Sequence, residues 1–437
     1  MNLTLQQWLD RIQALHPREI DLGLHRVREV AGRLGITRPA QHVITVAGTN
    51  GKGSTVAMLD AILRASGLHV GTYTSPHLHA YNERIRIQGH NASDAQICDA
   101  FARIEAARED LSLTYFEFST LAGLWLIAQA RPDVAVLEIG LGGRLDAVNL
   151  VDPDIAIVTS IGLDHMDWLG NTREAIGREK AGIFRSGIPA LCGDLEPPDS
   201  VIEEASRAGA HLRLQGVDFG FVKHERNWQW WGQDKAGRPL HWDGLPLPAL
   251  DLVNAATVVQ ALQFLPLFVP LAAVHGALDG LGLEGRFQKM ADPRHAFEVR
   301  VDVAHNPHAA GLLVQKLQEF KQRSGSGGRV HVVLAMMADK DQFGFYKALE
   351  SAVDFWYIAA FAETRGQRAE ALFGILLGEG GVIQGPYDNI AVAYEQACAI
   401  AGPDDLVLVT GSFVSVADVV RHLDGIRSNP IQTASRH

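Results

Sequence analysis

The sequence predicts two α/β domains, each built around a sheet of mainly parallel strands. Three observations lead to this prediction. The chain has 437 residues, which is too long for a single hydrophobic core. Short apolar runs alternate with helix-like runs in both halves, as expected for parallel sheets that helices cover on both faces. The alternation breaks between residues 282 and 292 and then resumes. We therefore expect domains over 1–285 and 296–437, joined by a linker over 286–295.

Composition narrows the class of protein. The hydrophobic share of 47% is ordinary for a globular domain, and no uninterrupted apolar run is long enough to span a membrane. The N-terminal residues mix acidic and basic side chains in a helical pattern, unlike a signal peptide. Three widely separated cysteines fit a reducing compartment. A net charge of −11 argues against general nucleic-acid binding. We expect a cytoplasmic protein whose partners are small molecules, with no membrane or nucleic acid involved.

The first half contains alternating strand-like and helix-like runs. Strands are expected over 43–47, 70–74, 134–139, 155–161 and 189–192, and helices over 54–65, 94–109, 118–129 and 172–183. The segment 219–242 differs because it holds four tryptophans between turn signals. That pattern predicts a β-hairpin or a small antiparallel subdomain, with its aromatic side chains used for packing. Helices over 251–264 and 271–281 follow.

The second half repeats the α/β alternation. Strands are expected over 297–304, 330–335, 355–360 and 406–410, and helices over 309–322, 342–351, 368–377, 389–400 and 414–423. A glycine- and serine-rich loop is expected over 324–328. This order predicts a doubly wound sheet. The polar tail from Arg427 is expected to be loose.

A glycine-rich loop joins the first strand to the helix that follows. Its residues are Gly48, Thr49, Asn50, Gly51, Lys52, Gly53 and Ser54. Such a loop leaves backbone N–H groups free to bind phosphates, and the helix adds its positive dipole end. Lys52 can reach the outer phosphates. The common P-loop has Ser or Thr directly after the lysine, whereas Gly53 stands there in this chain. The succession of strand, glycine-rich loop, lysine and helix still predicts a site for a nucleotide triphosphate. The alternative is an ordinary glycine-rich turn.

Polar residues follow or interrupt three of the predicted strands. Ser75 follows the run 70–74 and is either a Mg²⁺ ligand or a turn cap. Glu138 lies inside an apolar strand, where a carboxylate needs a cation; Mg²⁺ beside a triphosphate or Arg144 would provide it. His165 is a metal or phosphate contact, or a loop histidine that bonds to the backbone.

Several charged residues elsewhere in the chain can be interpreted either as structural residues or as ligand-binding residues. The pattern around Lys180 indicates an exposed lysine on a solvated helix face. Arg286, next to a glycine at the break between the halves, would clamp a phosphate or form an interdomain salt bridge. Asp302 and His305 close the first strand of the second domain, where they are expected to face a crevice. Asn306 before Pro307 sets a helix start.

These segments together resemble the Mur ligases, ATP-dependent enzymes that join amino acids to carboxylates. The motifs that carry the resemblance occur in family order over nearly the whole chain: Gly48–Ser54, Thr74–Leu78, Tyr115–Phe118, Glu138–Asp146, Asp164–His165, Arg178–Ile183, Gly285–Gln288 and Asp302–Pro307. The lysine between two glycines is similar to the folate branch of the family. Members of that branch add L-glutamate to dihydropteroate and to folates.

The resemblance implies an N-terminal P-loop ATPase domain, a smaller C-terminal Rossmann-like domain and a set of metal ligands. Ser75 and Glu138 would hold one Mg²⁺. A second Mg²⁺ would be supported by His165 and by a carbamate on Lys180, which replaces the exposed-lysine interpretation.

The resemblance also implies contacts with the nucleotide and with the substrates. Asn254, Arg286, Asp302 and His305 would contact the nucleotide. Phe116 would stack on the pterin ring, Asp146 would bind its amino-pyrimidine edge, and Ser412 would lie near the incoming glutamate.

The resemblance implies that the protein is a glutamate ligase whose reaction passes through an acyl phosphate. It also implies a monomer. Either dihydropteroate or reduced folates, or both, would accept the glutamate. A ligase with folylpolyglutamate synthase activity alone, or another Mur-type amino-acid ligase, is the alternative. The chain before residue 48 is too short for the extra N-terminal domain of the cell-wall Mur ligases. A nucleotide-dependent switch without ligase activity, or a kinase, is a further alternative.

Overall fold

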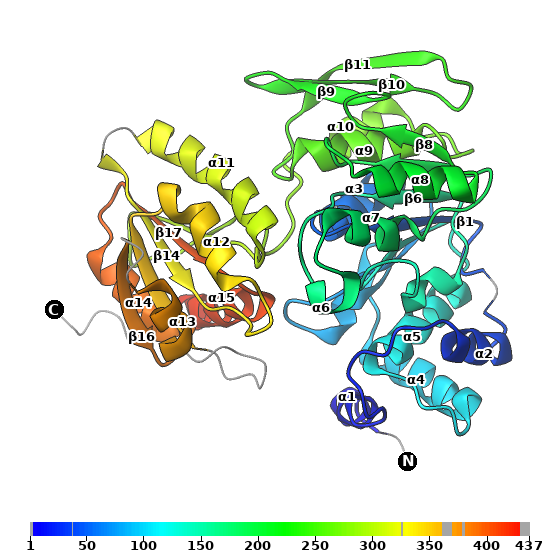
Figure 1. Cartoon of the computed structure of the whole chain (residues 1–437), viewed down its shortest axis with the longest axis horizontal. Helices are drawn as coiled ribbons and strands as arrows, with labels where there is room; N and C mark the ends of the chain where they lie inside the picture. The colour runs from blue at the N-terminus through cyan, green and yellow to red at the C-terminus, as the bar shows by residue number, and fades with distance from the viewer. Residues whose placement is uncertain (1–2, 37, 325–326, 361–368, 378–380, 429–437) are drawn as a thin grey trace. The chain divides into compact units, whose positions relative to one another are not determined.

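The computed structural model describes residues 3–36, 38–324, 327–360, 369–377 and 381–428. Two α/β units are present, as predicted, and Figure 1 shows both. Contacts group residues 1–162 and 166–282 into the first unit and residues 163–165 and 283–437 into the second. The domain limits at 285 and 296 stay a prediction.

The first unit contains an eight-stranded sheet with a parallel centre. In spatial order its strands are β4 (His90–Asn91), β3 (Ile85–Ile87), β2 (Val70–Tyr73), β5 (Val134–Glu138), β1 (His42–Ala47), β6 (Ile155–Val158), β7 (Pro189–Cys192) and β8 (His211–Leu214). The register pairs Val46 with Glu138 and Ala47 with Val158. The carboxyl ends of β5, β1 and β6 therefore meet at one edge, where ligands of such sheets bind. The antiparallel strands β3 and β4, which form one end of this sheet, were not predicted.

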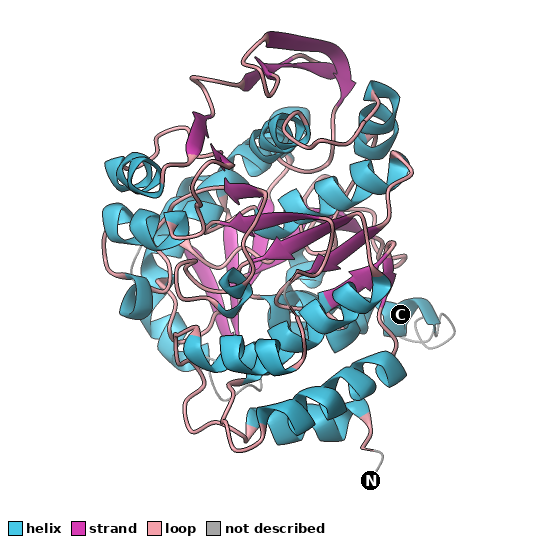
Figure 2. Cartoon of the chain, turned by 90° about the vertical axis from the view of Figure 1, so that its right-hand side faces the viewer, coloured by secondary structure: helices cyan, strands magenta, loops and turns pink. Residues whose placement is uncertain are grey.

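Helices cover both faces of this sheet, as Figure 2 shows. The helices of this unit are α1 (Leu5–Gln13), α2 (His25–Arg33), α3 (Lys52–Ala65), α4 (Asp94–Arg108), α5 (Tyr115–Ala130), α6 (Met166–Leu169), α7 (Arg173–Ala181), α8 (Asp199–Ala208), α9 (Leu252–Leu262) and α10 (Leu271–Leu278). α3 begins at Lys52, earlier than predicted, because Gly51 adopts a φ of 86° that lets the loop turn directly into the helix.

The tryptophan-rich segment forms a separate three-stranded antiparallel sheet, which confirms the predicted subdomain. Its strands are β9 (Gly220–Lys223), β10 (Asn227–Gln233) and β11 (Pro239–Pro246), with β10 in the centre. Every second residue of β10 is buried, including Trp228 and Trp230, so these aromatic side chains pack as expected. The small sheet lies beside α9 and α10 in Figure 1.

The second unit has a six-stranded sheet in the order β12 (Gln288–Met290), β13 (Glu298–Val301), β17 (Leu406–Thr410), β14 (Val330–Leu334), β15 (Phe355–Ala359) and β16 (Val382–Tyr387). All neighbours are parallel except β12 and β13, which are antiparallel. The strands β12 and β16 were not predicted. The helices are α11 (Pro307–Ser324), α12 (Gln342–Leu349), α13 (Ala369–Leu376), α14 (Ile390–Ile400) and α15 (Phe413–Ser428).

The predicted loose tail begins too early. Arg427 lies in the last turn of α15, and its guanidinium donates to the carbonyl oxygen of Ala291 at 2.8 Å. Residues 325–326, Arg368 and the tail from 429 lie outside the described residues. Among the described helices, none has the length and apolar character needed to cross a bilayer.

Candidate nucleotide and ligase site

The glycine-rich loop is fixed to the end of β6. Thr159 Oγ1 donates to the carbonyl oxygen of Asn50 at 2.6 Å, and Ser160 Oγ accepts from the Asn50 N–H at 3.1 Å. Thr49 Oγ1 accepts from the Gly162 N–H at 3.0 Å. A Cβ on Gly48, whose φ is 152°, would lie 1.8 Å from Thr159 Oγ1. The loop can therefore reach β6 only with glycine at position 48.

Lys52 and Asn254 both lie against this loop. Lys52 Nζ donates to the carbonyl oxygens of Gly48 and Thr49 at 2.8 and 3.2 Å, so the ammonium group folds back over the loop. Asn254, buried in α9, closes the other side, because a Cβ on Gly51 would lie 2.6 Å from its Oδ1. The structure thus brings Lys52 and Asn254 to the one segment that the sequence singled out for phosphate.

Ser75 and Glu138 meet at the carboxyl ends of β2 and β5. The Ser75 N–H donates to Glu138 Oε2 at 3.2 Å, and Glu138 is 5% exposed. Arg144, the alternative partner for this carboxylate, donates to Glu179 instead, at 2.7 Å. The backbone of Ser75 thus contacts the buried Glu138 carboxylate, and carboxylate and hydroxyl oxygens are ligands of the kind that Mg²⁺ prefers.

Lys180 is buried, with 4% of its surface exposed, so the exposed-lysine interpretation is wrong. The reason is tertiary packing. The loop after β5 lies on the last turn of α7, where the Arg144 N–H donates to the Glu179 carbonyl oxygen at 2.9 Å. A Cβ on Gly143 would lie 2.7 Å from that same oxygen. Helix periodicity cannot show that a loop from another part of the chain will cover one face.

Phe116, in the first turn of α5, and Asp146, in the loop after β5, both contact Gly140. The Phe116 ring covers Gly140, where an added Cβ would lie 2.3 Å from Cζ. Asp146 Oδ2 accepts from the N–H groups of Gly140 and Leu141 at 3.1 and 2.8 Å. Burial raises the pKa of Asp146 to about 7, although these backbone donors and Lys52 act in the opposite direction.

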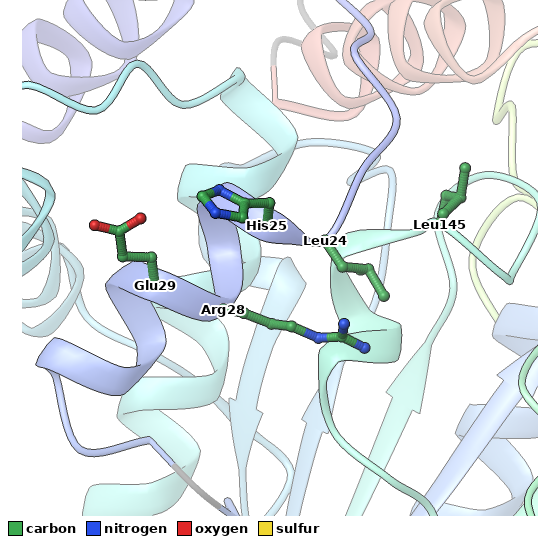
Figure 3. A pocket seen from close by; sticks show the side chains of 5 residues that line it. All are labelled: Leu24, His25, Arg28, Glu29 and Leu145. Atoms are coloured by element: carbon green, nitrogen blue, oxygen red, sulfur yellow. The ribbon is translucent and has the colours of Figure 1, made fainter.

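A cavity of about 630 Å³ opens between the start of α2 and the residue before Asp146. Its lining residues are Leu24, His25, Arg28, Glu29 and Leu145. Figure 3 shows the side chains of Leu24 and Arg28 extending to the same side, with Leu145 on the loop across from them. The cavity is wide open to solvent and combines two leucines with charged groups.

The second unit gathers polar groups around Asp164. Its carboxylate accepts from Lys340 Nζ at 2.7 Å and from Asn306 Nδ2 at 3.0 Å, and His305 Nε2 lies 3.5 Å away. Burial acts to raise the pKa of Asp164, but the hydrogen bond with His305 and the charges of His165 and Lys340 hold it well below its usual range. His165 Nε2 lies 3.4 Å from Lys340 Nζ, so a lysine shares the surroundings of the predicted metal ligand.

Asp302 and Arg286 lie in the same unit. Asp302 accepts from the N–H groups of Phe287 and Ala304, both at 2.8 Å, and burial raises its pKa against the charge of Arg286. The Arg286 guanidinium carbon lies 5.3 Å from the centre of the Phe413 ring, within cation–π range.

Two residues cap helices in this unit. Ser412 Oγ accepts from the Ser415 N–H at 2.9 Å at the start of α15. Asn306 caps α11, because its Oδ1 accepts from the Ala309 N–H at 2.9 Å, as predicted.

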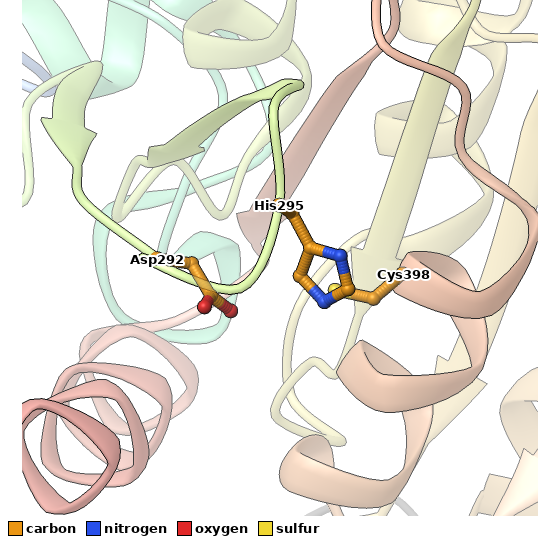
Figure 4. A group of neighbouring side chains, drawn as sticks. All are labelled: Asp292, His295 and Cys398. Carbon is orange, nitrogen blue, oxygen red and sulfur yellow. The ribbon is translucent and has the colours of Figure 1, made fainter. Parts of the chain in front are cut away.

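Asp292, His295 and Cys398 also lie close together, and Figure 4 shows them on the loop after β12 and on α14. Their potential ligand atoms lie within 4.8 Å of one another. Both oxygens of Asp292 are already used: Arg294 donates to each of them, at 3.0 and 2.7 Å, and Tyr394 adds a bond of 2.9 Å. A cation placed there would face the Arg294 guanidinium, so we interpret this group as a structural ion-pair network.

Sequence reasoning missed three parts of these sites. Thr159 and Ser160 directly follow β6, and the rule about strand ends would have selected them. Lys340 follows β14 in the chain, and the rule about strand ends would have selected its loop. Arg28 gave no signal, because a helical arginine on an amphipathic surface helix is ordinary.

Comparison with known proteins gives the same picture. Residues 46–192 match the Mur ligase middle domain and residues 285–413 match the Mur ligase, glutamate ligase domain. The chain is 46% identical to the dihydrofolate synthase/folylpolyglutamate synthase of Escherichia coli K12, over 97% of this chain and 96% of that protein. A solved structure of E. coli FolC in complex with DHPP and ADP has a TM-score of 0.91 at 45% identity, covering 97% of this chain and 99% of that one.

Another solved structure shows what a relative binds. It is a bifunctional folylpolyglutamate synthase/dihydrofolate synthase with Mn, AMPPNP and L-glutamate bound, with a TM-score of 0.88 at 44% identity, covering 97% of this chain and 98% of that one. Both halves of the chain and its full length thus match ATP-dependent ligases. The chain belongs to the Mur ligase family and, within it, to the bifunctional dihydrofolate synthase/folylpolyglutamate synthases.

Proposed function

We propose that this ligase adds L-glutamate to dihydropteroate and to folates at the expense of ATP. The observation that carries the proposal is the 46% identity with the E. coli enzyme along 97% of the chain. The fixed phosphate loop and the Ser75–Glu138 pair support it independently. We further propose that the protein acts as a cytoplasmic monomer.

ATP is proposed to bind with its phosphates on Gly48, Thr49, Asn50, Gly51, Lys52, Gly53 and Ser54. Lys52 already lies over this loop, 2.8 Å from the Gly48 carbonyl oxygen, and would turn outward to the phosphates. Asn254 would contact the nucleotide from α9. Arg286, Asp302 and His305 are proposed as further nucleotide contacts, and a guanidinium suits a phosphate because it offers paired donors.

Two Mg²⁺ ions are proposed. The residues present fit the first, since the Ser75 hydroxyl and the Glu138 carboxylate are oxygen ligands, and the Ser75 N–H donates to Glu138 Oε2. His165 and Lys180 would support the second. The ions would supply positive charge to offset the phosphate oxygens.

A carbamate on Lys180 fits its burial. The ammonium group would first lose one proton. The neutral amine nitrogen would then attack CO₂, forming an N–C bond and releasing a second proton, so that a cation becomes a carboxylate-like anion. A buried carbamate needs a cation beside it, because an anion that is removed from water without a counter-charge is costly. Lys180 is 4% exposed, and the proposed second Mg²⁺ would be that cation.

The acceptor is proposed to bind near Phe116 and Asp146. The Phe116 ring offers a flat face for a pterin, and the Asp146 carboxylate is an acceptor for the N–H groups of its amino-pyrimidine edge. The cavity beside Leu145 would take the rest of the acceptor, with Arg28 attracting its carboxylates. Ser412 is proposed to lie near the incoming glutamate.

The reaction would proceed in two transfers. An acceptor carboxylate oxygen attacks the γ-phosphorus of ATP, the bond to the β-phosphate oxygen breaks, and ADP leaves. The glutamate nitrogen then attacks the acyl carbon, the bond to phosphate breaks, and the nitrogen loses a proton. Lys52 and Arg286 would stabilise the negative charge that gathers on the transferred group. No covalent enzyme nucleophile takes part.

The test is ADP release from ATP and Mg²⁺ with glutamate and either dihydropteroate or tetrahydrofolate. We expect glutamate-dependent release with both acceptors. Release with tetrahydrofolate alone would instead support a folylpolyglutamate synthase, the name of the 30% identical relative from Lacticaseibacillus casei. No glutamate-dependent release with any folate acceptor would refute the proposal.

A further inference from the structure

The small tryptophan-rich sheet makes specific contacts with one helix. Trp230 of β10 is fully buried, and its indole N–H donates to the carbonyl oxygen of Ala256 in α9 at 3.1 Å. Trp228, two residues earlier on the same strand, is equally buried, but its indole N–H donates to Pro246 of β11 at 2.9 Å. Trp230 thus connects the small sheet to α9, whereas Trp228 connects two strands within that sheet.

A second contact repeats the connection one turn farther along α9. Gln260 is fully buried; its Nε2 donates to the Gln233 carbonyl oxygen at 2.7 Å and its Oε1 accepts from the Gln233 N–H at 3.2 Å. The side-chain amide therefore pairs with the end of β10 as another strand would. A Cβ on Gly232 would lie 2.3 Å from both Gln260 Oε1 and the Trp230 ring. The strand and the helix approach so closely that only glycine fits there.

The same helix carries Asn254 to the phosphate loop. Ala256 follows Asn254 by two residues, which is about 3 Å along a helix axis. The Asn254 amide packs against Gly51, the N-cap residue just before α3, so closely that a Cβ there would lie within 2.6–3.0 Å of three atoms of that amide. A slide or rotation of α9 of about 1 Å would either open this contact or force the loop to move.

We propose that Trp230 and Gln260 are positioning residues of the nucleotide site. They fix α9 against β10 and thereby hold Asn254 on the phosphate loop. The inference rests on the proposed nucleotide site and assigns a role to the tryptophan-rich sheet, which is otherwise a packing element. If this inference is right, loss of the Trp230 indole hydrogen bond weakens nucleotide binding at the phosphate loop, even when an aromatic side chain is kept at position 230.

The test compares Trp230→Phe with Trp228→Phe by calorimetric titration with ADP and Mg²⁺. Each variant loses one indole hydrogen bond of a fully buried tryptophan, so both melting temperatures should fall. We expect Trp230→Phe alone to raise the Kd for ADP by about threefold to tenfold, the range that one lost hydrogen bond allows. The KM for ATP should rise equally, with the KM for glutamate unchanged.

A double mutant distinguishes an effect that acts through Asn254 from a general loss of stability. If Trp230 acts through Asn254, the pair Asn254→Ala and Trp230→Phe should bind ADP no more weakly than Asn254→Ala alone. Additive losses would overturn the inference, and so would equal ADP affinity of the two Trp→Phe variants. Failure of the wild-type protein to bind ADP would instead refute the proposed function itself.

Gln260→Met serves if Trp230→Phe does not fold. It keeps the length of the side chain and removes both bonds to Gln233. Gln263→Met is its control, because Gln263 Nε2 donates only at 3.1 Å to Val259 within the same helix. We expect Gln260→Met to weaken ADP binding severalfold and Gln263→Met to leave it unchanged; equal affinities would overturn the inference.

Discussion

Gly48→Ala probes the contact that fixes the phosphate loop. The added Cβ would lie 1.8 Å from Thr159 Oγ1, 3.1 Å from its Cβ and 3.2 Å from its N atom. Rotation of the Thr159 side chain relieves only the first contact and breaks its 2.6 Å bond to Asn50. A lost buried hydrogen bond and a positive φ at a residue with a Cβ each cost about 1–2 kcal/mol. A cost of about 2–4 kcal/mol that appears wholly in binding would raise the Kd for ADP by about 30- to 900-fold.

The assay is calorimetric titration with ADP, with urea unfolding of each variant in parallel. Gly67→Ala is the control, since Gly67 also has a positive φ, of 81°, but meets open space beyond the other end of α3. It should lose stability and keep its affinity for ADP. Wild-type affinity in Gly48→Ala would refute the reasoning. Because the clash involves Thr159 Oγ1, Gly48→Ala and Thr159→Ala should also be non-additive.

Three further predictions concern the ligase chemistry. Lys180→Ala should lose most of its activity and regain part of it with short carboxylates, while Arg178→Ala on the exposed face of α7 stays active; full activity of Lys180→Ala would contradict the carbamate. Burial raises the pKa of Asp146 to about 7, so its carboxylate is ionised mainly above that pH. The KM for dihydropteroate should therefore rise as the pH falls through 7, and Asp146→Asn should abolish this dependence; an unchanged pH profile would argue against a pterin contact. Arg28→Ala should raise the KM for the folate acceptor severalfold with an unchanged Kd for ADP, whereas Arg33→Ala in the last turn of α2 should alter neither; equal kinetics of both variants would remove the cavity from the site.

The central strands could be predicted because each is a short apolar run. The segment 189–192 matches β7, and 406–410 matches β17. Strands that lie at sheet edges were missed for a physical reason. β16 contains Gly385 and Pro386, which interrupt the usual strand pattern, and one side of an edge strand needs no partner.

The site could be predicted where its chemistry leaves a local pattern. Gly48 and Lys52 are such cases, because a phosphate loop is continuous in sequence. Lys180 is the opposite case. Its burial depends on the loop that contains Gly143, far away in the chain, so its helix alone indicated exposure. The contact of Trp230 with α9 could not be predicted for the same reason, because a turn and another strand separate the two in the sequence.

Glutamate-dependent ADP release tests the central claim most directly. With ATP, Mg²⁺ and dihydropteroate present, the rate should be near zero without L-glutamate and rise to saturation as it is added. A new amide product should appear in equal amount to ADP. ADP release that is the same with and without glutamate, or that yields no amide, would contradict the assignment of this chain as a glutamate-adding ligase.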